Sequence, residues 1–188
     1  MIARHLSGEP RAFEELVECF GGPVYAFFQR QGVEPSAAED LFQETFLRVH
    51  RSARRYDPER PFRAWLYTIA HNLLRSHWRA RRVRRVLGGW WRRGEGRARD
   101  PESDCVPADR RLDARQRVRF IESALQDLPV GQRQALYLAR VEGLAVADCA
   151  RVLGVPVPTA KTWLRRARLA LADALERWER GEPKGVEP

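Results

Sequence analysis

Helical periodicity runs through almost the whole chain, and no segment alternates in the manner of a β-strand. Apolar side chains recur three and four positions apart, which gathers them on one face of a helix. In the first half we expect helices over residues 11–20, resuming after Gly21–Gly22–Pro23 as far as Gln31, over 36–54, and from 61 onward. In the second half we expect helices over 112–128, 130–141, 145–153 and 158–178. The pattern predicts an all-α protein.

Local signals set the expected boundaries. Ser36 to Glu39 form a capping-box pattern, in which a hydroxyl and a carboxylate bind free backbone donors. Pro61 opens the third helix at a favoured first-turn position, and Gly88–Gly89 end it. From there to about residue 108, Gly, Pro, Arg and acids follow without periodicity, which is typical of a linker. We therefore expect two small helical domains, 1–87 and 112–180, a flexible linker at 88–111, and a disordered tail at 181–188.

The positive charge is concentrated in one stretch. Of 34 basic residues 32 are Arg, and residues 75–99 contain ten Arg and one acid, which gives this stretch the whole net charge of +9. A concentrated basic stripe fits a polyanion such as nucleic acid better than diffuse basicity does. A solvated or disordered charged face remains an alternative, as does the codon usage of a GC-rich genome.

Other features exclude several classes of protein. Cys19, Cys105 and Cys149 are widely separated and odd in number, which argues against a disulfide framework and against a zinc site built from cysteine pairs. No run approaches the roughly 20 apolar residues of a membrane span, and Met1 to Pro10 lack the apolar stretch of a signal peptide. We expect a cytoplasmic protein without metal, cofactor or membrane insertion.

Two predicted helices carry a second, non-core face. The helix over 36–54 has one apolar face, made of Ala38, Phe42, Phe46 and Val49, and an opposite polar face, made of Asp40, Gln43, Glu44, Leu47 and Arg51. An apolar Leu47 within polar surroundings suits a protein contact, although an ordinary solvated face stays open.

The helix from Pro61 places Phe62, Leu66, Ile69 and Leu73 toward the core. Its far side carries Tyr67, His71, Arg75, Trp78 and Arg82. Rings interleaved with Arg suit single-stranded DNA, because bases stack on the rings while cations hold the backbone. Burial of this side against the first helix is the alternative.

The second half contains a helix-turn-helix pattern. Ala150 lets two helices approach closely, and Gly154, four residues later, relieves the backbone at the turn. The helix that follows buries Ala160, Leu164, Ala167, Leu171 and Leu175, and leaves Thr162, Arg165 and Arg166 outward with Lys161 at the shoulder. This is the geometry of a recognition helix in a major groove, although two cations and a hydroxyl also suit a plain surface.

Together these segments resemble the extracytoplasmic-function (ECF) class of bacterial sigma factors. Residues 40–46, DLFQETF, resemble the family's D-L-x-Q-E-x-F motif, and residues 62–72, FRAWLYTIAHN, resemble F-x-x-W-L-x-x-I-A-x-N. Leu128–Pro129, Gln132–Arg133, Glu142–Gly143–Leu144 and residues 160–168, AKTWLRRAR, match its second domain. The order and spacing hold from about Gly8 to Trp178.

The resemblance implies a region 2-like helical bundle and a region 4-like helix-turn-helix domain. Such a protein binds core RNA polymerase, recognises the −10 and −35 promoter elements and promotes strand opening for transcription initiation. The implied partners are the clamp helices of the largest polymerase subunit, the flap region, promoter DNA and an anti-sigma factor, which could hold the protein at the membrane. The polymerase contacts carried over are Asp40, Gln43, Glu44 and Leu47.

The implied DNA contacts fall into two groups. In the family, the loop after the second helix and the helix that follows capture a base flipped from the −10 element, which costs a few kcal/mol of unstacking. The positions carried over or predicted for the −10 single strand are Tyr56, Asp57, Arg60, Arg63, Tyr67, His71, Asn72, Arg75, Trp78 and Arg79. Those for the −35 element are Lys161, Thr162, Arg165 and Arg166. The chain departs from the family pattern at Cys149, Ala160 and Trp163, and by Trp90–Trp91 in a long basic linker.

Two other functions compete with this interpretation. A dimeric helix-turn-helix regulator explains the second half but gives the Asp40 face and the Tyr67 face no role, whereas a sigma factor is expected to be a monomer when free of partners. A nuclease using Asp40, Glu44, His71 and His77 lacks metal-ligand spacing or a nucleophile–base arrangement. We therefore expect no catalytic residue.

Overall fold

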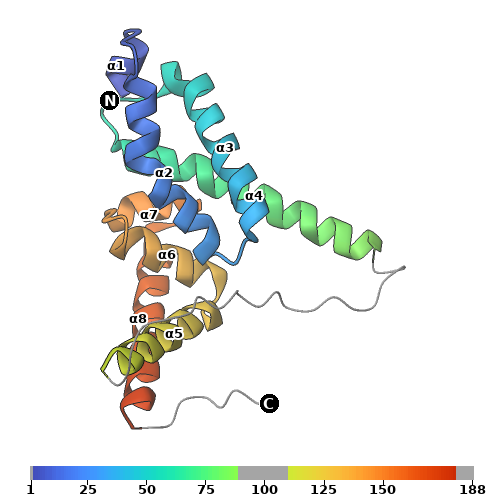
Figure 1. Ribbon diagram of the computed structural model, residues 1–188, viewed down its shortest axis with the longest axis vertical. Helices are drawn as coiled ribbons and strands as arrows, with labels where there is room; N and C mark the ends of the chain where they lie inside the picture. The colour runs from blue at the N-terminus through green and yellow to red at the C-terminus, as the bar shows by residue number, and fades with distance from the viewer. Residues whose placement is uncertain (1, 89–109, 181–188) are drawn as a thin grey trace.

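The computed structural model describes residues 2–88 and 110–180 of the 188-residue chain, and side chains within 2–83 and 116–180. All regular elements in these ranges are helices, which confirms the all-α prediction. Figure 1 shows the N-terminal half above the C-terminal half. The expected linker and tail, with Trp90–Trp91 and Cys105, lie outside the described residues, apart from the helix ends at Gly88 and Arg110–Arg111.

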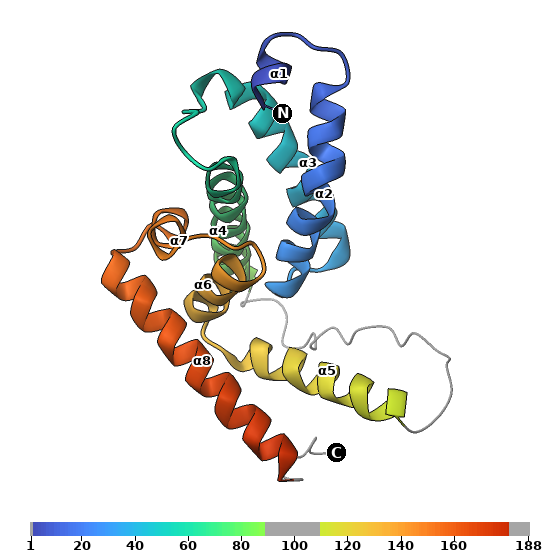
Figure 2. The same ribbon diagram turned by 90° about the vertical axis from the view of Figure 1, so that its left-hand side faces the viewer.

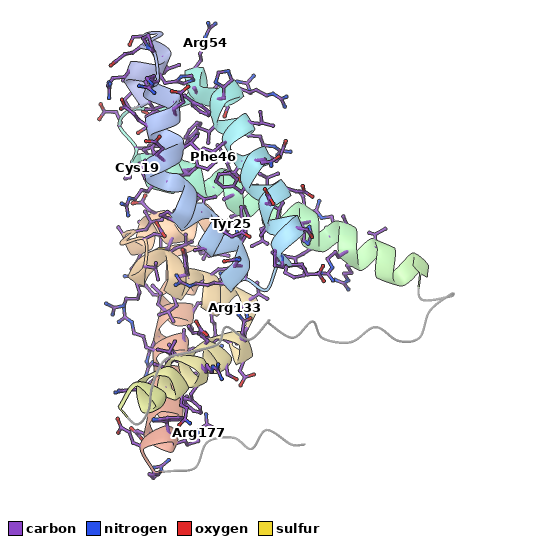
Figure 3. All side chains as sticks on the ribbon, in the orientation of Figure 1. Cys19, Tyr25, Phe46, Arg54, Arg133 and Arg177 are labelled. Atoms are coloured by element: carbon purple, nitrogen blue, oxygen red, sulfur yellow. The ribbon has the colours of Figure 1, made fainter. Side chains whose placement is uncertain are left out.

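The N-terminal half is built from four α-helices and one short 3₁₀ turn. They are α1 (Ile2–Leu6), α2 (Ala12–Arg30), α3 (Pro35–Ser52), η1 (Ala53–Arg55) and α4 (Phe62–Gly88). α3 packs against both α2 and α4. Their buried side chains include Leu16, Val24, Phe28, Phe46, Val49, Leu66 and Leu74, all at most 5% exposed. Figure 3 shows Phe46 pointing into the space between α2 and α3.

Helix α2 continues through Pro23, where we expected an interruption. Proline removes one backbone donor and crowds the preceding turn, which normally breaks a helix. Here Leu16 on one side of Pro23 and Val24 and Phe27 on the other lie on the same buried face. We attribute the unbroken helix to the burial of this shared apolar stripe, which offsets the lost hydrogen bond.

The expected capping box is wrong. Helix α3 begins at Pro35, with Glu34 as the N-cap and no side-chain hydrogen bond at the cap. Pro35 has a fixed φ and no backbone N–H, so it starts the helix one residue early and places Ser36 inside the first turn. Pro61 is also displaced, because α4 begins at Phe62, while the Pro61 carbonyl accepts a hydrogen bond from the Trp65 backbone N–H at 3.3 Å.

The C-terminal half contains α5 (Arg110–Asp127), α6 (Val130–Arg140), α7 (Val146–Leu153) and α8 (Val157–Glu179). The predicted turn between α7 and α8 is confirmed: Gly154 has φ 66° and ends α7 in the left-handed conformation that glycine adopts without strain. Ala150 is buried, as the close approach of the two helices requires. Helix α5 crosses the far part of α8, where Phe120 and Trp178 have ring centroids 5.1 Å apart.

The two halves pack directly against each other. Figure 2 shows α6 and α7 beside α4 and the end of α2, and α7 packs against α4. At the junction the ring of Phe27 in α2 lies 5.4 Å from those of Tyr67 in α4 and Tyr137 in α6. These rings connect the apolar side chains of both halves into one continuous core.

Candidate polymerase and nucleic-acid interfaces

The polar face of α3 is open to solvent. Asp40, Gln43 and Leu47 are exposed, Leu47 to 48%, whereas Leu41 and Thr45 on the other side are buried. Glu44 accepts a hydrogen bond from Nε of Arg48 at 2.7 Å, an exposed pair one helical turn apart and therefore weak. Acidic and amide acceptors around one apolar side chain form a surface suited to a protein partner.

The segment after α3 forms a closed turn. The Tyr56 hydroxyl donates to the Arg60 carbonyl at 2.6 Å, and Asp57 accepts from the Glu59 backbone N–H at 3.1 Å and pairs with Nε of Arg60 at 3.1 Å. Arg63 lies beside this turn, in the first turn of α4, and its side chain is exposed. These bonds hold in a fixed shape a turn that was predicted to bind DNA.

Three rings gather beside this turn. The Tyr56 ring lies 5.1 Å from Trp65 and 5.7 Å from Phe62, and burial first, then the charge of Asp57, raises the pKa of Tyr56 above its usual value. All three rings are half-buried, so part of each remains available for stacking. Trp65 was missed as a site residue in the sequence, where it was quoted only as part of a motif. Its spacing of three residues from Phe62 was the available signal.

Some of the predicted DNA-binding residues of α4 are exposed and others are buried. Asn72, Arg75 and Arg79 are exposed. Trp78 is half-buried with the Arg81 guanidinium 5.6 Å above its ring, and its indole N–H has no hydrogen-bond partner among the described residues. This part of the helix keeps the mixture of ring and cation that suits a single strand.

Tyr67 and His71 are not exposed, so the expectation of an open far side is wrong at these two positions. Tyr67 is 0% and His71 4% exposed. Burial against α2 was the alternative considered, and the Tyr67–Phe27 contact agrees with it. The C-terminal half also buries these side chains. Helical periodicity within α4 could not predict this contact, because it depends on a distant part of the chain.

Burial changes the chemistry of both side chains. It raises the pKa of Tyr67 far above its usual value, with Glu142 and Tyr137 adding to the rise, although the Tyr67 hydroxyl makes no hydrogen bond of normal geometry to any described residue. Burial, and then the nearby Arg75 charge, lowers the pKa of His71 to about 4. Both His71 ring nitrogens also lack hydrogen-bond partners among the described residues. His71 is therefore neutral at pH 7.

The N-terminal part of α8 presents the predicted recognition residues. Lys161, Thr162, Arg165 and Arg166 are all exposed, and the three cations make no ion pair with any described residue. The Thr162 hydroxyl donates to the Pro158 carbonyl at 2.9 Å and keeps its acceptor capacity. A groove between α7 and α8 adds Arg168, which the sequence analysis missed; it is lined by Val146, Lys161, Leu164, Arg165, Arg168 and Leu169.

Trp163 packs inward, against α6. A Cβ atom at Gly131 in α6 would lie 2.7 Å from two atoms of the Trp163 ring, so the indole rests directly on the bare glycine backbone. Ala160, Leu164 and Ala167 lie on the same inner side of α8, and each is at most 3% exposed. Trp163 therefore fixes the start of α8 against α6.

The residues of the nuclease hypothesis do not come together. Asp40 and Glu44 lie on the open face of α3, whereas His71 is buried beneath the C-terminal half. Among the described residues no group of three or more His, Cys, Asp or Glu side chains is placed to hold a metal ion. None of the described helices has the length and apolar character that crossing a bilayer requires.

Comparison with known proteins identifies the family. The family model for Sigma-70 region 2 matches residues 16–84, and that for Sigma-70, region 4 matches residues 121–171. RNA polymerase sigma factor CnrH of Cupriavidus metallidurans is 30% identical over 177 residues, which cover 94% of this chain and 93% of that protein. The chain is an ECF sigma factor.

Further similarities agree with this identification. The ECF RNA polymerase sigma factor SigF of Caulobacter vibrioides is 31% identical to this sigma factor over 180 residues, 94% of this chain and 93% of that protein. Among solved structures, CnrH in complex with the cytosolic domain of CnrY matches with a TM-score of 0.64, 27% identity, and coverage of 93% and 94%. The sigma factor RpoE from Bartonella quintana, in complex with the anti-sigma factor NepR, matches with a TM-score of 0.69 and 25% identity. The match covers 88% of this chain and 98% of that chain.

Membership in this family defines the role of the molecule. The sigma factor binds core RNA polymerase and directs it to promoter DNA for transcription initiation. The open face of α3 and the exposed cations predicted to bind DNA on α8 lie on separate helices.

Proposed function

We propose that three surfaces divide the work of this sigma factor. Asp40, Gln43, Glu44 and Leu47 on α3 bind the clamp helices of the largest polymerase subunit. The closed turn from Tyr56 to Arg63, with the exposed residues of α4, binds the non-template strand of the −10 element. The N-terminal face of α8 reads the −35 element in the duplex, and the polymerase flap region holds the C-terminal half.

The observation that carries this assignment is the arrangement of α8. Its inner side is buried in the helix-turn-helix core, while Lys161, Arg165 and Arg166 extend into solvent without an ion-pair partner among the described residues. An exposed cation without an internal partner is free to bind a base edge or a phosphate without first breaking a contact. The added Arg168 extends the basic surface along the groove beside α7.

Runoff transcription with core polymerase tests the assignment. A promoter library with randomised −10 and −35 positions, sequenced after runoff, gives the preferred sequence. We expect Lys161→Ala or Arg165→Ala to cost on the order of 1–3 kcal/mol in discrimination at the −35 positions. Arg177→Ala, at the other end of α8, is the matched control and should leave the preference unchanged. Equal use of altered −35 sequences by the wild type and the variants would refute the assignment.

Two further statements belong to this proposal. The two solved relatives are complexes with another protein, and NepR is an anti-sigma factor. We therefore infer that an anti-sigma factor restrains this chain as well and can hold it at the membrane. We also infer that the sigma factor acts in the cytoplasm and has no catalytic activity of its own. Cleavage of DNA by the purified protein with a divalent metal would contradict the last point.

A further inference from the structure

The first helix, α1, is held to the rest of the molecule by few contacts. Figure 1 shows it beside α2, at the end of the N-terminal half that lies away from the C-terminal half. Its five residues are too few for a helix that is stable alone, and Ile2 is the one side chain buried within α1. Arg4 pairs with Glu9 and Glu15, but these exposed pairs contribute little. The position of α1 therefore depends largely on its remaining contact, which His5 makes.

His5 belongs to a cluster of three rings from three helices. Its ring centroid lies 4.9 Å from that of Phe13 in α2 and 5.0 Å from that of His50 in α3. The Phe13 and His50 centroids are 5.2 Å apart. Neutral imidazoles pack in such a cluster as other aromatic rings do, whereas two imidazolium rings in contact repel each other. The cluster therefore favours the neutral form of both histidines.

The charges around the cluster do not offset protonation. The charged side chains within one helical turn of the three rings, or on η1, are Arg4, Glu9, Arg11, Glu14, Glu15, Arg48, Arg51, Arg54 and Arg55. All three of these carboxylates already pair with arginines, and neither histidine pairs with a described carboxylate. Arg54, at this end of the molecule in Figure 3, is one of the cations with no ion pair to a described residue. An added proton therefore enters surroundings that are already positive.

The protonation of His5 is linked to the position of α1. Burial first, and then the neighbouring His50, lowers the pKa of His5 below its ordinary value of 6.5. Once α1 leaves the cluster, both causes disappear and the ordinary pKa returns. The released helix therefore binds a proton more readily than the packed helix, so a decrease in pH below about 6.5 favours release.

The connection between α1 and α2 also favours release. Arg11 has φ 67°, a left-handed conformation that residues other than glycine rarely adopt. Such strain persists only while the surrounding contacts hold the backbone in place. Release of α1 relieves it.

The closed turn after α3 is connected to α1 through η1. Helix α1 contacts η1, in which Ala53 is 1% exposed. The Ala53 carbonyl accepts a hydrogen bond from the Tyr56 backbone N–H at 3.0 Å. Tyr56 in turn closes the turn through its hydroxyl bond to the Arg60 carbonyl. Release of α1 removes cover from η1 and so loosens the start of the turn.

We propose that the ring cluster of His5, Phe13 and His50 is a proton-sensitive latch, which releases α1 from η1 on acidification and loosens the closed turn from Tyr56 to Arg63. A metal ion fits the histidine pair less well, because the surrounding charge is positive and the described residues offer no third ligand. The role of the turn at the −10 strand rests on the proposed function, whereas the latch itself does not.

Amide hydrogen exchange of the full-length protein tests the latch, at about pH 7.5 and about pH 5.5 and after correction for the intrinsic exchange rate. The reporters are the backbone N–H groups of Ser7 and Glu9, which donate to carbonyls of α1 at 3.0 Å, and that of Tyr56. An imidazole that is neutral only in the packed form increases the released population by up to about tenfold at pH 5.5. We expect protection to decrease by roughly three- to tenfold at all three reporters. Equal protection at the two pH values, at α1 or at Tyr56, would overturn the proposal.

Double variants of the pair separate the latch from general effects of acid. His5→Phe with His50→Phe keeps three rings but binds no proton, so its protection at α1 should not depend on pH. His71 is present in all of these proteins, so its titration affects them equally. A decrease in protection as large as that of the wild type would refute the role of the pair.

Permanent charges test the same point at a single pH. At about pH 7.5, where unperturbed histidine is neutral, His5→Lys with His50→Lys should show the low protection of the acidified wild type. His5→Gln with His50→Gln, which also lacks the rings but carries no charge, is the matched control and should be better protected. Equal exchange in the two variants would show that charge does not release α1. None of these measurements involves DNA or polymerase, so failure of the wild type in runoff would refute the functional assignment alone.

Discussion

Substitution of Gly131 by alanine should destabilise the protein, which is the reverse of the usual effect in a helix. Replacing glycine by alanine inside a helix ordinarily stabilises it by up to about 1 kcal/mol. At this position the new Cβ would lie 2.7 Å from two Trp163 ring atoms and 3.0 Å from a third. The indole is a rigid ring between α6 and α8, so it cannot move aside by rotating a flexible chain end.

The magnitude follows from these opposed effects. Overpacking a core by one carbon costs about 1–3 kcal/mol. The opposing gain in helix propensity from glycine to alanine is smaller than its maximum, because residue 131 lies in the first turn of α6. We expect a net loss of about 1–2 kcal/mol, or roughly 3–6 °C in Tm. Because Trp163 fixes the start of α8, Gly131→Ala should also weaken −35 discrimination by Lys161 and Thr162.

Thermal and urea unfolding of four proteins measure this effect: wild type, Gly131→Ala, Trp163→Leu and the double variant. The smaller leucine removes the clash, so in its background Gly131→Ala should be neutral or slightly stabilising. The cycle therefore has a coupling of about 1–2 kcal/mol. Gln132→Ala, on the next residue, is the control and should change stability by less than about 0.5 kcal/mol. A higher Tm for Gly131→Ala alone would show that the Trp163 contact is absent.

Three further predictions follow from the described residues. The pKa of His71 is lowered from 6.5 to about 4, so between these pH values the unfolded chain binds a proton at His71 and the folded chain does not. The contribution of neutral His71 to the free energy of unfolding is therefore complete above about pH 6.5. It falls by about 3 kcal/mol as the pH decreases to about 4. Urea unfolding at several pH values should show this loss in the wild type but not in His71→Leu. An equal dependence of the unfolding free energy on pH in both proteins would disprove it. Asp40→Ala with Glu44→Ala should weaken holoenzyme assembly in gel filtration without lowering Tm, whereas the exposed neighbour Glu39→Ala should not; normal assembly by the double variant would contradict the role of α3. Gly154→Ala forces a side chain to adopt φ 66° and should cost about 1–2 kcal/mol in thermal unfolding, which an unchanged Tm would exclude.

The regular features of single helices were predictable from the sequence. The burial of Leu66 and Leu73 in α4, and of Leu164 and Ala167 in α8, follows from apolar residues repeating every three or four positions. The turn at Gly154 was predictable because glycine adopts a positive φ without strain. The motif resemblance, rather than periodicity, assigned functions to these helices, and the comparisons confirm the family while the individual contacts remain predictions.

Features that depend on two distant segments were not predictable. The predicted capping box at Ser36 failed for a local reason, because Pro35 already starts the helix. The predicted exposure of Tyr67 and His71 was wrong, and the role of Trp163 could not be predicted, for another reason. Tyr67 contacts Tyr137 and Trp163 contacts Gly131, and each partner lies more than 30 residues away in the sequence.

Sequence alone determined which side of each helix is apolar, because that property depends on the chemistry of residues within one or two turns. Only the tertiary structure decided which apolar or aromatic side chains meet, because packing selects partners by shape and proximity in space. Tyr67 illustrates the difference. Its ring and hydroxyl suit either a DNA strand or a protein core, and the position of α6 places it in the core.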